Sequence, residues 1–192
     1  MCRVCVGGLG SSTTLGREDT CEVVVQGHSS GGVVSTCGHP SRGLFFSVGD
    51  DSTVRCWNTS TRRLQFMHTL AEAGQNGAGI KLLNGTCIDV AEHVCVGMSN
   101  GAFRVLSCGS RTGFKLLGTF RPRGKSSVVC VRYSPKGESL AVGCIDQTVD
   151  MFRRDGEKYE AYRHIQIPLG GYAVSLDWSQ DSLMIRSGTS TR

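Results

Sequence analysis

The feature that most constrains this chain is a short apolar segment that ends in glycine and recurs along the whole sequence. The copies end at intervals of 42 to 48 residues, at Gly7, Gly49, Gly97, Gly143 and Gly188. A repeat of about 40–45 residues is typical of proteins that stack four-stranded blades around a common axis. The spacing therefore predicts a β-propeller.

Each full copy of the repeat also has the same internal order of apolar runs and turns. An apolar run is followed by a turn, a second run ending in the glycine, a polar turn, an alternating run, a charged turn and a fourth run. Ser134-Pro135-Lys136-Gly137 is a good hairpin turn, because proline presets φ and glycine accepts a positive φ. No stretch of ten residues has helical periodicity. The order predicts four antiparallel strands per unit.

These patterns divide the chain into blades. We expect an all-β, incomplete WD40-type β-propeller of about four blades, each a four-stranded antiparallel sheet. The predicted ranges are 1–26 for the tail of a preceding blade, 27–70, 80–119 and 120–166 for blades, 71–79 for an inter-blade loop, and 167–192 for the start of a truncated blade. A closed ring needs at least four whole blades, so the remaining blades of a longer propeller are expected partners.

Several residues stand where WD40 blades carry their structural positions. Gly27-His28 precedes the first strand of its blade, Trp57 ends the third strand, and Asp51 and Asp146 lie in the turn before a third strand. In WD40 blades such an aspartate commonly bonds the histidine, so His28 and Asp51 are expected to pair. Trp178 is the fifth structural position.

The composition excludes several classes of protein. The formal net charge is +5, but the basic residues are scattered and no basic stripe alternates with aromatic residues, so nucleic acid is not an expected partner. No apolar run reaches the ~18–20 residues needed to span a bilayer, and the first ten residues do not resemble a signal peptide. The chain is expected to be cytoplasmic, without a membrane partner.

Catalytic and metal-binding motifs are not found in the sequence. Cys2 and Cys5 form the one CxxC, with no second pair at zinc spacing. The cysteines inside apolar runs are expected to be reduced and buried, and they are Cys5, Cys56, Cys95, Cys130 and Cys144. The glycine-rich 7–10 lacks the spacing of a phosphate loop, and 74–79 is expected to be a flexible loop. We therefore expect no enzyme, metal or cofactor; a propeller enzyme would need acids or metal ligands lining a central channel.

Particular runs resemble the echinoderm microtubule-associated protein-like family over most of the chain, from about Val23 to Gly188. The telling run is Leu176-Asp177-Trp178-Ser179-Gln180-Asp181-Ser182, which is followed by a glycine-containing strand. One departure is Val34, near which the family usually has an aromatic residue. The other matching runs are Gln26-Gly27-His28, His39-Pro40-Ser41, Val96 to Phe103, Tyr133 to Gly143 and Thr148-Val149-Asp150.

The resemblance implies part of a tandem propeller in a cytoskeletal protein that associates with tubulin or microtubules. The family's hydrophobic motif and coiled-coil segment, on which filament attachment depends in shorter members, are not in this chain. A generic WD40 scaffold, or a substrate-receptor subunit of another complex, is the alternative interpretation.

The predicted binding residues lie in loops, where a propeller presents variable side chains on a rigid scaffold. The positive charge of the arginines and the lysine among them predicts a preference for acidic partners. We expect them at one rim of the propeller, and they are Arg62, Arg63, Arg121, Arg123, Lys125 and Tyr172.

Overall fold

The described part of the chain consists of strands and turns, without a helix and so without one that could cross a membrane. The structure is a computed structural model. It describes the backbone of residues 4–7, 12–17, 20–28, 31–73, 79–109, 112–168 and 171–190, with side chains described from Gly27 onward.

The strands form antiparallel sheets in which neighbours in sequence are neighbours in space. The first sheet has three strands, β1 (Val4–Gly7), β2 (Ser12–Arg17) and β3 (Thr20–Gln26). Three sheets of four strands follow. They are β4 (Val33–Gly38), β5 (Leu44–Gly49), β6 (Thr53–Asn58) and β7 (Arg63–Thr69); β10 (Gly85–Val90), β11 (Val94–Met98), β12 (Phe103–Gly109) and β13 (Gly113–Phe120); and β14 (Val128–Tyr133), β15 (Ser139–Cys144), β16 (Thr148–Asp155) and β17 (Lys158–Gln166). A two-stranded sheet of β18 (Ala173–Trp178) and β19 (Ile185–Thr189) comes last.

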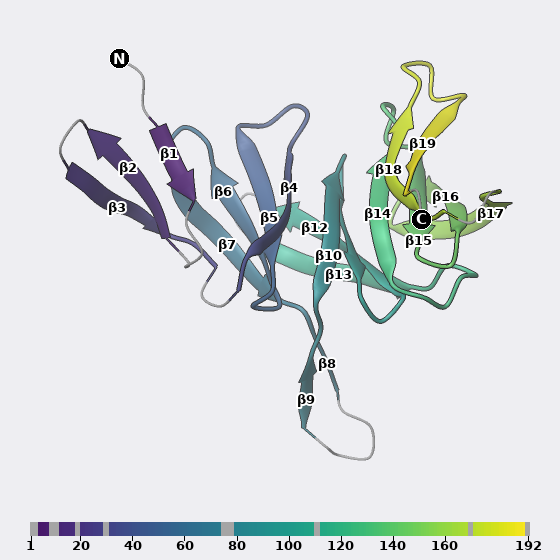
Figure 1. Ribbon diagram of the computed structural model, residues 1–192, viewed down its shortest axis with the longest axis horizontal. Helices are drawn as coiled ribbons and strands as arrows, with labels where there is room; N and C mark the ends of the chain where they lie inside the picture. The colour runs from purple at the N-terminus through teal and green to yellow at the C-terminus, as the bar shows by residue number, and fades with distance from the viewer. Residues whose placement is uncertain are drawn as a thin grey trace.

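The sheets stand side by side like the blades of an open fan, as Figure 1 shows from β4–β7 to β18–β19. The first strands of successive sheets are in contact, β4 with β10, β10 with β14 and β14 with β18. The buried side chains lie between sheets: one cluster joins Phe46 and Val54 to Ile88, and the next joins Phe103 to Leu140. This packing confirms the prediction of an all-β, incomplete propeller.

Antiparallel order gives the fan two rims with different loops. The connection rim holds the links between sheets together with the turns β5–β6, β11–β12 and β15–β16, and Ser99 N donates to Asn84 O across it. The turn rim holds the turns between first and second and between third and fourth strands, where Thr59 N donates to Gly43 O. A loop's rim is thus fixed by its place in the strand order.

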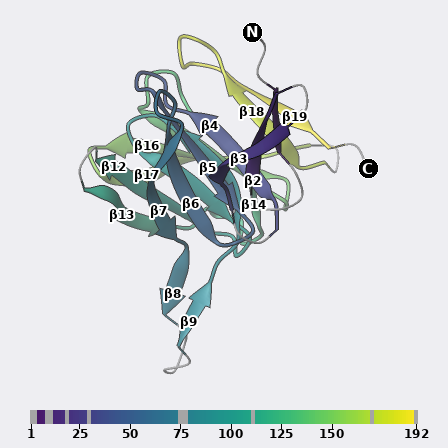
Figure 2. The same cartoon turned by 90° about the vertical axis from the view of Figure 1, so that its left-hand side faces the viewer.

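A short hairpin leaves the connection rim between the first two full sheets. It pairs β8 (Ala71–Ala73) with β9 (Ile80–Leu82) and projects away from the sheets in both views (Figures 1 and 2). The predicted loop 71–79 therefore begins with a strand. The two strands are three-residue runs that alternate in polarity, and they are hard to recognise beside a glycine-rich stretch. Residues 74–78 lie outside the described residues.

Two of the repeat glycines, Gly97 and Gly143, lie where neighbouring sheets approach each other closely. A Cβ on Gly97 would lie 2.6 Å from Cγ1 of Val128 on the next sheet, and closer still to the Cys87 sulfur. A Cβ on Gly143 would lie 2.6 Å from the Cys130 sulfur and 3.3 Å from Ala173 Cβ. At these two glycines the close approach is therefore between sheets.

Gly97→Ala is expected to destabilise the chain by about 1–3 kcal/mol, because the stiff Val128 side chain leaves no room for a methyl group. The measurement is the urea midpoint of unfolding. Gly38→Ala is the matched control, since nothing lies within 4 Å of its Cβ position. Equal midpoints for the two variants would contradict this account of the glycine.

Candidate functional site

A buried relay of hydrogen bonds joins the strands of the β4–β7 sheet. Trp57 Nε1 donates to Ser47 Oγ at 2.9 Å, and Ser47 Oγ lies 2.8 Å from His28 Nε2. His28 Nδ1 lies 2.8 Å from Asp51 Oδ1, and His28 is 2% exposed. The relay is satisfied throughout if Ser47 donates to Nε2 and Nδ1–H donates to the carboxylate. The structure thus brings three predicted positions, His28, Asp51 and Trp57, into one network.

Asp51 is the hub at the connection rim. Its Oδ1 accepts from the backbone and hydroxyl of Thr53 at 3.1 and 2.6 Å, and its Oδ2 accepts from Arg55 Nη2 at 3.0 Å. Arg55 Nη1 also donates to Gly27 O at 2.7 Å. These bonds hold the β5–β6 turn and the segment that enters β4 in fixed positions. This part of the connection rim is therefore rigid.

The other two predicted structural positions lie outside such a relay. Asp146 accepts from Thr148 Oγ1 at 2.6 Å in the β15–β16 turn, and Trp178 Nε1 donates to Arg132 O on the preceding sheet at 3.1 Å. Trp178 ends the first strand of its sheet, whereas Trp57 ends the third. Position therefore decides their role: Asp146 stabilises its own turn, and Trp178 joins two sheets.

A second buried network, which sequence reasoning missed, joins the β10–β13 and β14–β17 sheets. His93 Nδ1 lies 3.0 Å from Tyr159 Oη, which lies 2.9 Å from Tyr133 Oη. Asp89 Oδ2 accepts from Tyr133 N at 2.7 Å. Burial raises the pKa of Tyr159 to about 12 and lowers that of His93 below its usual range. Its members are up to 70 residues apart along the chain, so no local pattern points to it.

The predicted binding residues do not share one rim. Arg62 and Arg63 lie at the β6–β7 turn, on the turn rim, whereas Arg121, Arg123, Lys125 and Tyr172 lie in connections between sheets. Because each strand reverses direction, the end of a third strand and the end of a fourth strand fall on opposite rims. The expectation of a single binding rim is therefore corrected to two separate groups.

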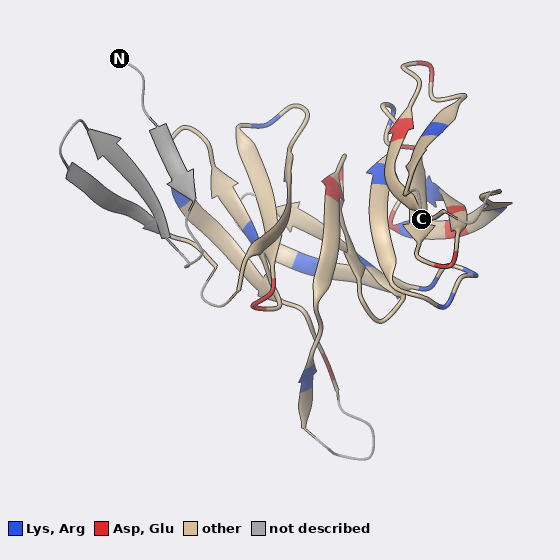
Figure 3. Ribbon diagram, viewed as in Figure 1, with Lys and Arg blue, Asp and Glu red and all other residues tan. Residues whose placement is uncertain are grey.

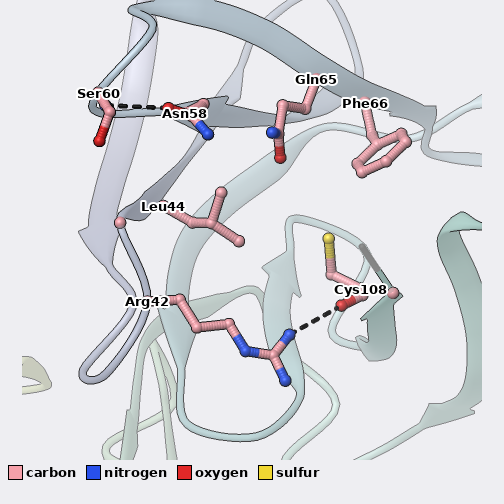
Figure 4. Close-up of a pocket in the computed structure, with 9 residues that line it drawn as sticks. Arg42, Leu44, Asn58, Ser60, Gln65, Phe66 and Cys108 are labelled. Carbon is pink, nitrogen blue, oxygen red and sulfur yellow. Dashed lines mark hydrogen bonds between the residues drawn. The ribbon is translucent and has the colours of Figure 1, made fainter. Parts of the chain in front are cut away.

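A pocket of about 670 Å³ lies at the turn rim, between the first two full sheets (Figure 4). Its side chains mix polar groups, such as Asn58 and Gln65, with Leu44 and the Phe66 ring. Arg42 Nη1 donates to Cys108 O at 3.5 Å across it. Asn58 Oδ1 accepts from Ser60 N at 2.9 Å, which fixes the adjacent turn.

The described side chains form no cluster suited to metal binding. Nowhere in that part of the chain do three or more His, Cys, Asp or Glu gather as metal ligands. Cys56, Cys95, Cys130 and Cys144 are free thiols and buried, as predicted, whereas the side chains of Cys2 and Cys5 lie outside the described residues. Residues 8–10 of the glycine-rich run are also outside them.

Basic and acidic residues are interspersed along the described part of the chain, as the ribbon in Figure 3 shows. Arg154 pairs with Glu92 at the turn rim, and Arg186 pairs with Asp177 at 3.0 Å. A rim can therefore favour an acidic partner only through small groups of basic side chains.

The comparisons with known proteins match this repeat organisation. The chain matches the family "WD domain, G-beta repeat" at residues 19–58 and 114–152. The first match runs from β3, the last strand of its sheet, to the end of β6, and so includes the whole His28–Trp57 relay. Each matched sequence repeat therefore begins one strand before the sheet that holds its other three strands.

Three relatives cover most of the chain. It is 28% identical to "77 kDa echinoderm microtubule-associated protein" of Lytechinus variegatus, over 79% of the chain and 21% of that protein. It is 27% identical to "Echinoderm microtubule-associated protein-like 3" of Homo sapiens, over 97% of the chain and 21% of the relative. It is 24% identical to "Ciliary WD repeat-containing protein ctxp80" of Euplotoides octocarinatus, over 95% and 27%. The chain thus spans about a fifth to a quarter of these relatives.

Ser47→Ala is expected to destabilise the chain by about 1–3 kcal/mol, because it leaves the buried Trp57 Nε1 and His28 Nε2 without their shared partner. The measurement is the urea midpoint of unfolding. Ser187→Ala, at an exposed position of β19, is the control and is expected to leave the midpoint unchanged.

His93 is expected to make stability fall in acid. Its pKa is held below the ordinary 6.5 by burial, so the unfolded chain takes up a proton first as the pH falls. A falling pH stabilises the state that binds more protons, which here is the unfolded chain. The free energy of unfolding therefore decreases below about pH 6.5. His93→Gln should lose less stability than the wild type between about pH 7.5 and pH 5.5, measured by urea unfolding. Equal losses of stability in the variant and the wild type would contradict the attribution of this pH dependence to His93.

Proposed function

Because this chain is a WD40-repeat propeller segment similar to the echinoderm microtubule-associated proteins, we propose that it is a non-enzymatic interaction module of a microtubule-associated cytoskeletal protein. The similarity to relatives named as microtubule-associated carries the proposal, since it extends over 79% to 97% of the chain. We place its action in the cytoplasm, on the cytoskeleton, with tubulin or microtubules as the partner.

The construction of the fan supports an interaction role. The sheets share apolar cores, and the buried relay fixes a turn at the connection rim. A rigid scaffold of this kind holds the exposed loop residues in constant positions, which lowers the entropy cost of binding a protein surface.

The connection between β13 and β14 is the best-placed basic group for an acidic partner. Arg121, Arg123 and Lys125 are exposed, and no carboxylate of the described residues lies within ion-pair distance of them. The loop itself is held in place, because Arg123 N donates to Asp150 Oδ2 at 2.7 Å and Arg121 Nη1 to Asn100 O at 3.1 Å. A fixed loop with three uncompensated charges attracts an acidic surface.

The test is co-sedimentation of the chain with stabilised microtubules, and capture of free tubulin, at about 50 and 200 mM salt. Reversal of Arg121, Arg123 and Lys125 to glutamate is expected to weaken binding by roughly tenfold or more, and salt should weaken wild-type binding. Reversal of Arg62 and Arg63, on the opposite rim, is the matched control for added negative charge.

If the wild-type chain bound neither microtubules nor free tubulin, this result would contradict the cytoskeletal proposal and favour a generic WD40 scaffold. If binding survived both the triple reversal and the higher salt concentration, tubulin would remain the proposed partner. The β13–β14 connection would then be excluded as the binding site. Thermal unfolding of each variant checks that the substitutions leave the fold intact.

A further inference from the structure

Three sheets carry a buried charged residue at the same place in the third strand. Each third strand has a register shift, at Cys56/Trp57, Val105/Leu106 and Met151/Phe152. The residue that precedes each of these pairs is charged: Arg55, Arg104 or Asp150. Their exposed fractions are 7%, 5% and 1%, so all three charges are removed from water.

Two of these charges are compensated within the protein. Arg55 pairs with Asp51 at 3.0 Å and donates to Gly27 O and Thr53 Oγ1. Asp150 accepts from Arg123 N and lies 2.7 Å from His164 Nδ1. In both sheets the buried charge therefore has a partner able to offset its lost hydration.

Arg104 has no such compensation among the described residues. Its Nη2 donates to Ala71 O at 2.7 Å, its buried Nε has no hydrogen-bond partner, and no carboxylate lies within ion-pair distance. Asn100 takes the place of Asp51 in the turn: its Oδ1 accepts from Ala102 N, as Asp51 Oδ1 accepts from Thr53 N, but it carries no charge. Burial lowers the pKa of Arg104, and the Glu72 carboxylate offsets only part of this effect. A buried cation of this kind favours an added anion.

The Arg104 guanidinium points at the base of the β8–β9 hairpin, since Ala71 begins β8. Pairing of Ala71 with Leu82 and of Ala73 with Ile80 places four apolar side chains on one face, with Glu72 and Lys81 on the other. Ile80 and Leu82 are 78% and 58% exposed. The exposed apolar face thus begins at Ala71, the residue whose carbonyl accepts the Arg104 hydrogen bond.

We propose that Arg104 and the apolar face of the β8–β9 hairpin dock an acidic, partly apolar segment of a partner protein. A carboxylate of the segment approaches the edge of the Arg104 guanidinium that accounts for its 5% exposure, next to Ala71, and the segment's apolar side chains cover Ile80 and Leu82. This inference rests on the proposed function in that it gives the interaction module a contact site. It concerns a different loop of the connection rim from Arg121, Arg123 and Lys125.

The test uses the whole chain and a short fluorescent peptide of alternating leucine and glutamate, with a leucine–glutamine peptide as the uncharged control, read by fluorescence anisotropy. Arg104→Met is expected to weaken binding about tenfold or more and to leave the unfolding temperature equal or raised, because an apolar side chain of similar size replaces a desolvated charge. Arg153→Met, at an exposed position of β16, is the matched control.

Two further variants test the two halves of the site. The double variant Ile80→Ser, Leu82→Ser should weaken binding without a change in unfolding temperature, since both side chains are exposed. Glu72→Gln should strengthen binding, because it removes the carboxylate that acts on Arg104 in the free protein. Unchanged affinity in Arg104→Met, equal binding of the glutamine peptide, or no binding by the wild type would each overturn the proposal. No microtubules are present, so failure here is distinct from failure of the proposed function.

Discussion

The close approach of neighbouring sheets is the constraint on which the rest of the structure depends. A single sheet of this chain has no core of its own, because its buried side chains pack against those of the next sheet. That packing brings the second strand of one sheet against the first strand of the next, with no space for a side chain at Gly97 or Gly143. The apolar runs supply the driving force, and the glycines permit the distance at which it acts.

Dense packing between sheets makes an unpaired buried polar group costly, and the sheets satisfy most of their buried polar groups in different ways. The β4–β7 sheet uses the relay from Trp57 to Asp51. The next two sheets share the contacts of His93 with Tyr159 and of Tyr159 with Tyr133. Arg104 departs from this rule, since its position matches that of a compensated residue in each neighbouring sheet. Departures from full polar satisfaction are expected where a protein binds something.

The division into two rims gives these features their functional meaning. The fixed Asp51 turn, the β8–β9 hairpin and the basic β13–β14 connection all lie on the connection rim, whereas Arg62, Arg63 and the pocket beside Phe66 lie on the turn rim. A partner that approaches one rim therefore meets a different set of side chains from one that approaches the other.

Alternation, turn chemistry and repeat spacing are local along the chain, and they were enough to predict the repeat, the strand order and the pairing of His28 with Asp51. It did not reveal the β8–β9 strands, whose three-residue runs are too short to stand out beside a glycine-rich stretch. Only the tertiary structure decided which loops share a rim, that Tyr133, Tyr159 and His93 form one network, and that Arg104 lacks a counter-ion. The physical reason is that hydrogen bonds and charge compensation depend on the position of side chains from different sheets, which are set by packing rather than by neighbouring residues.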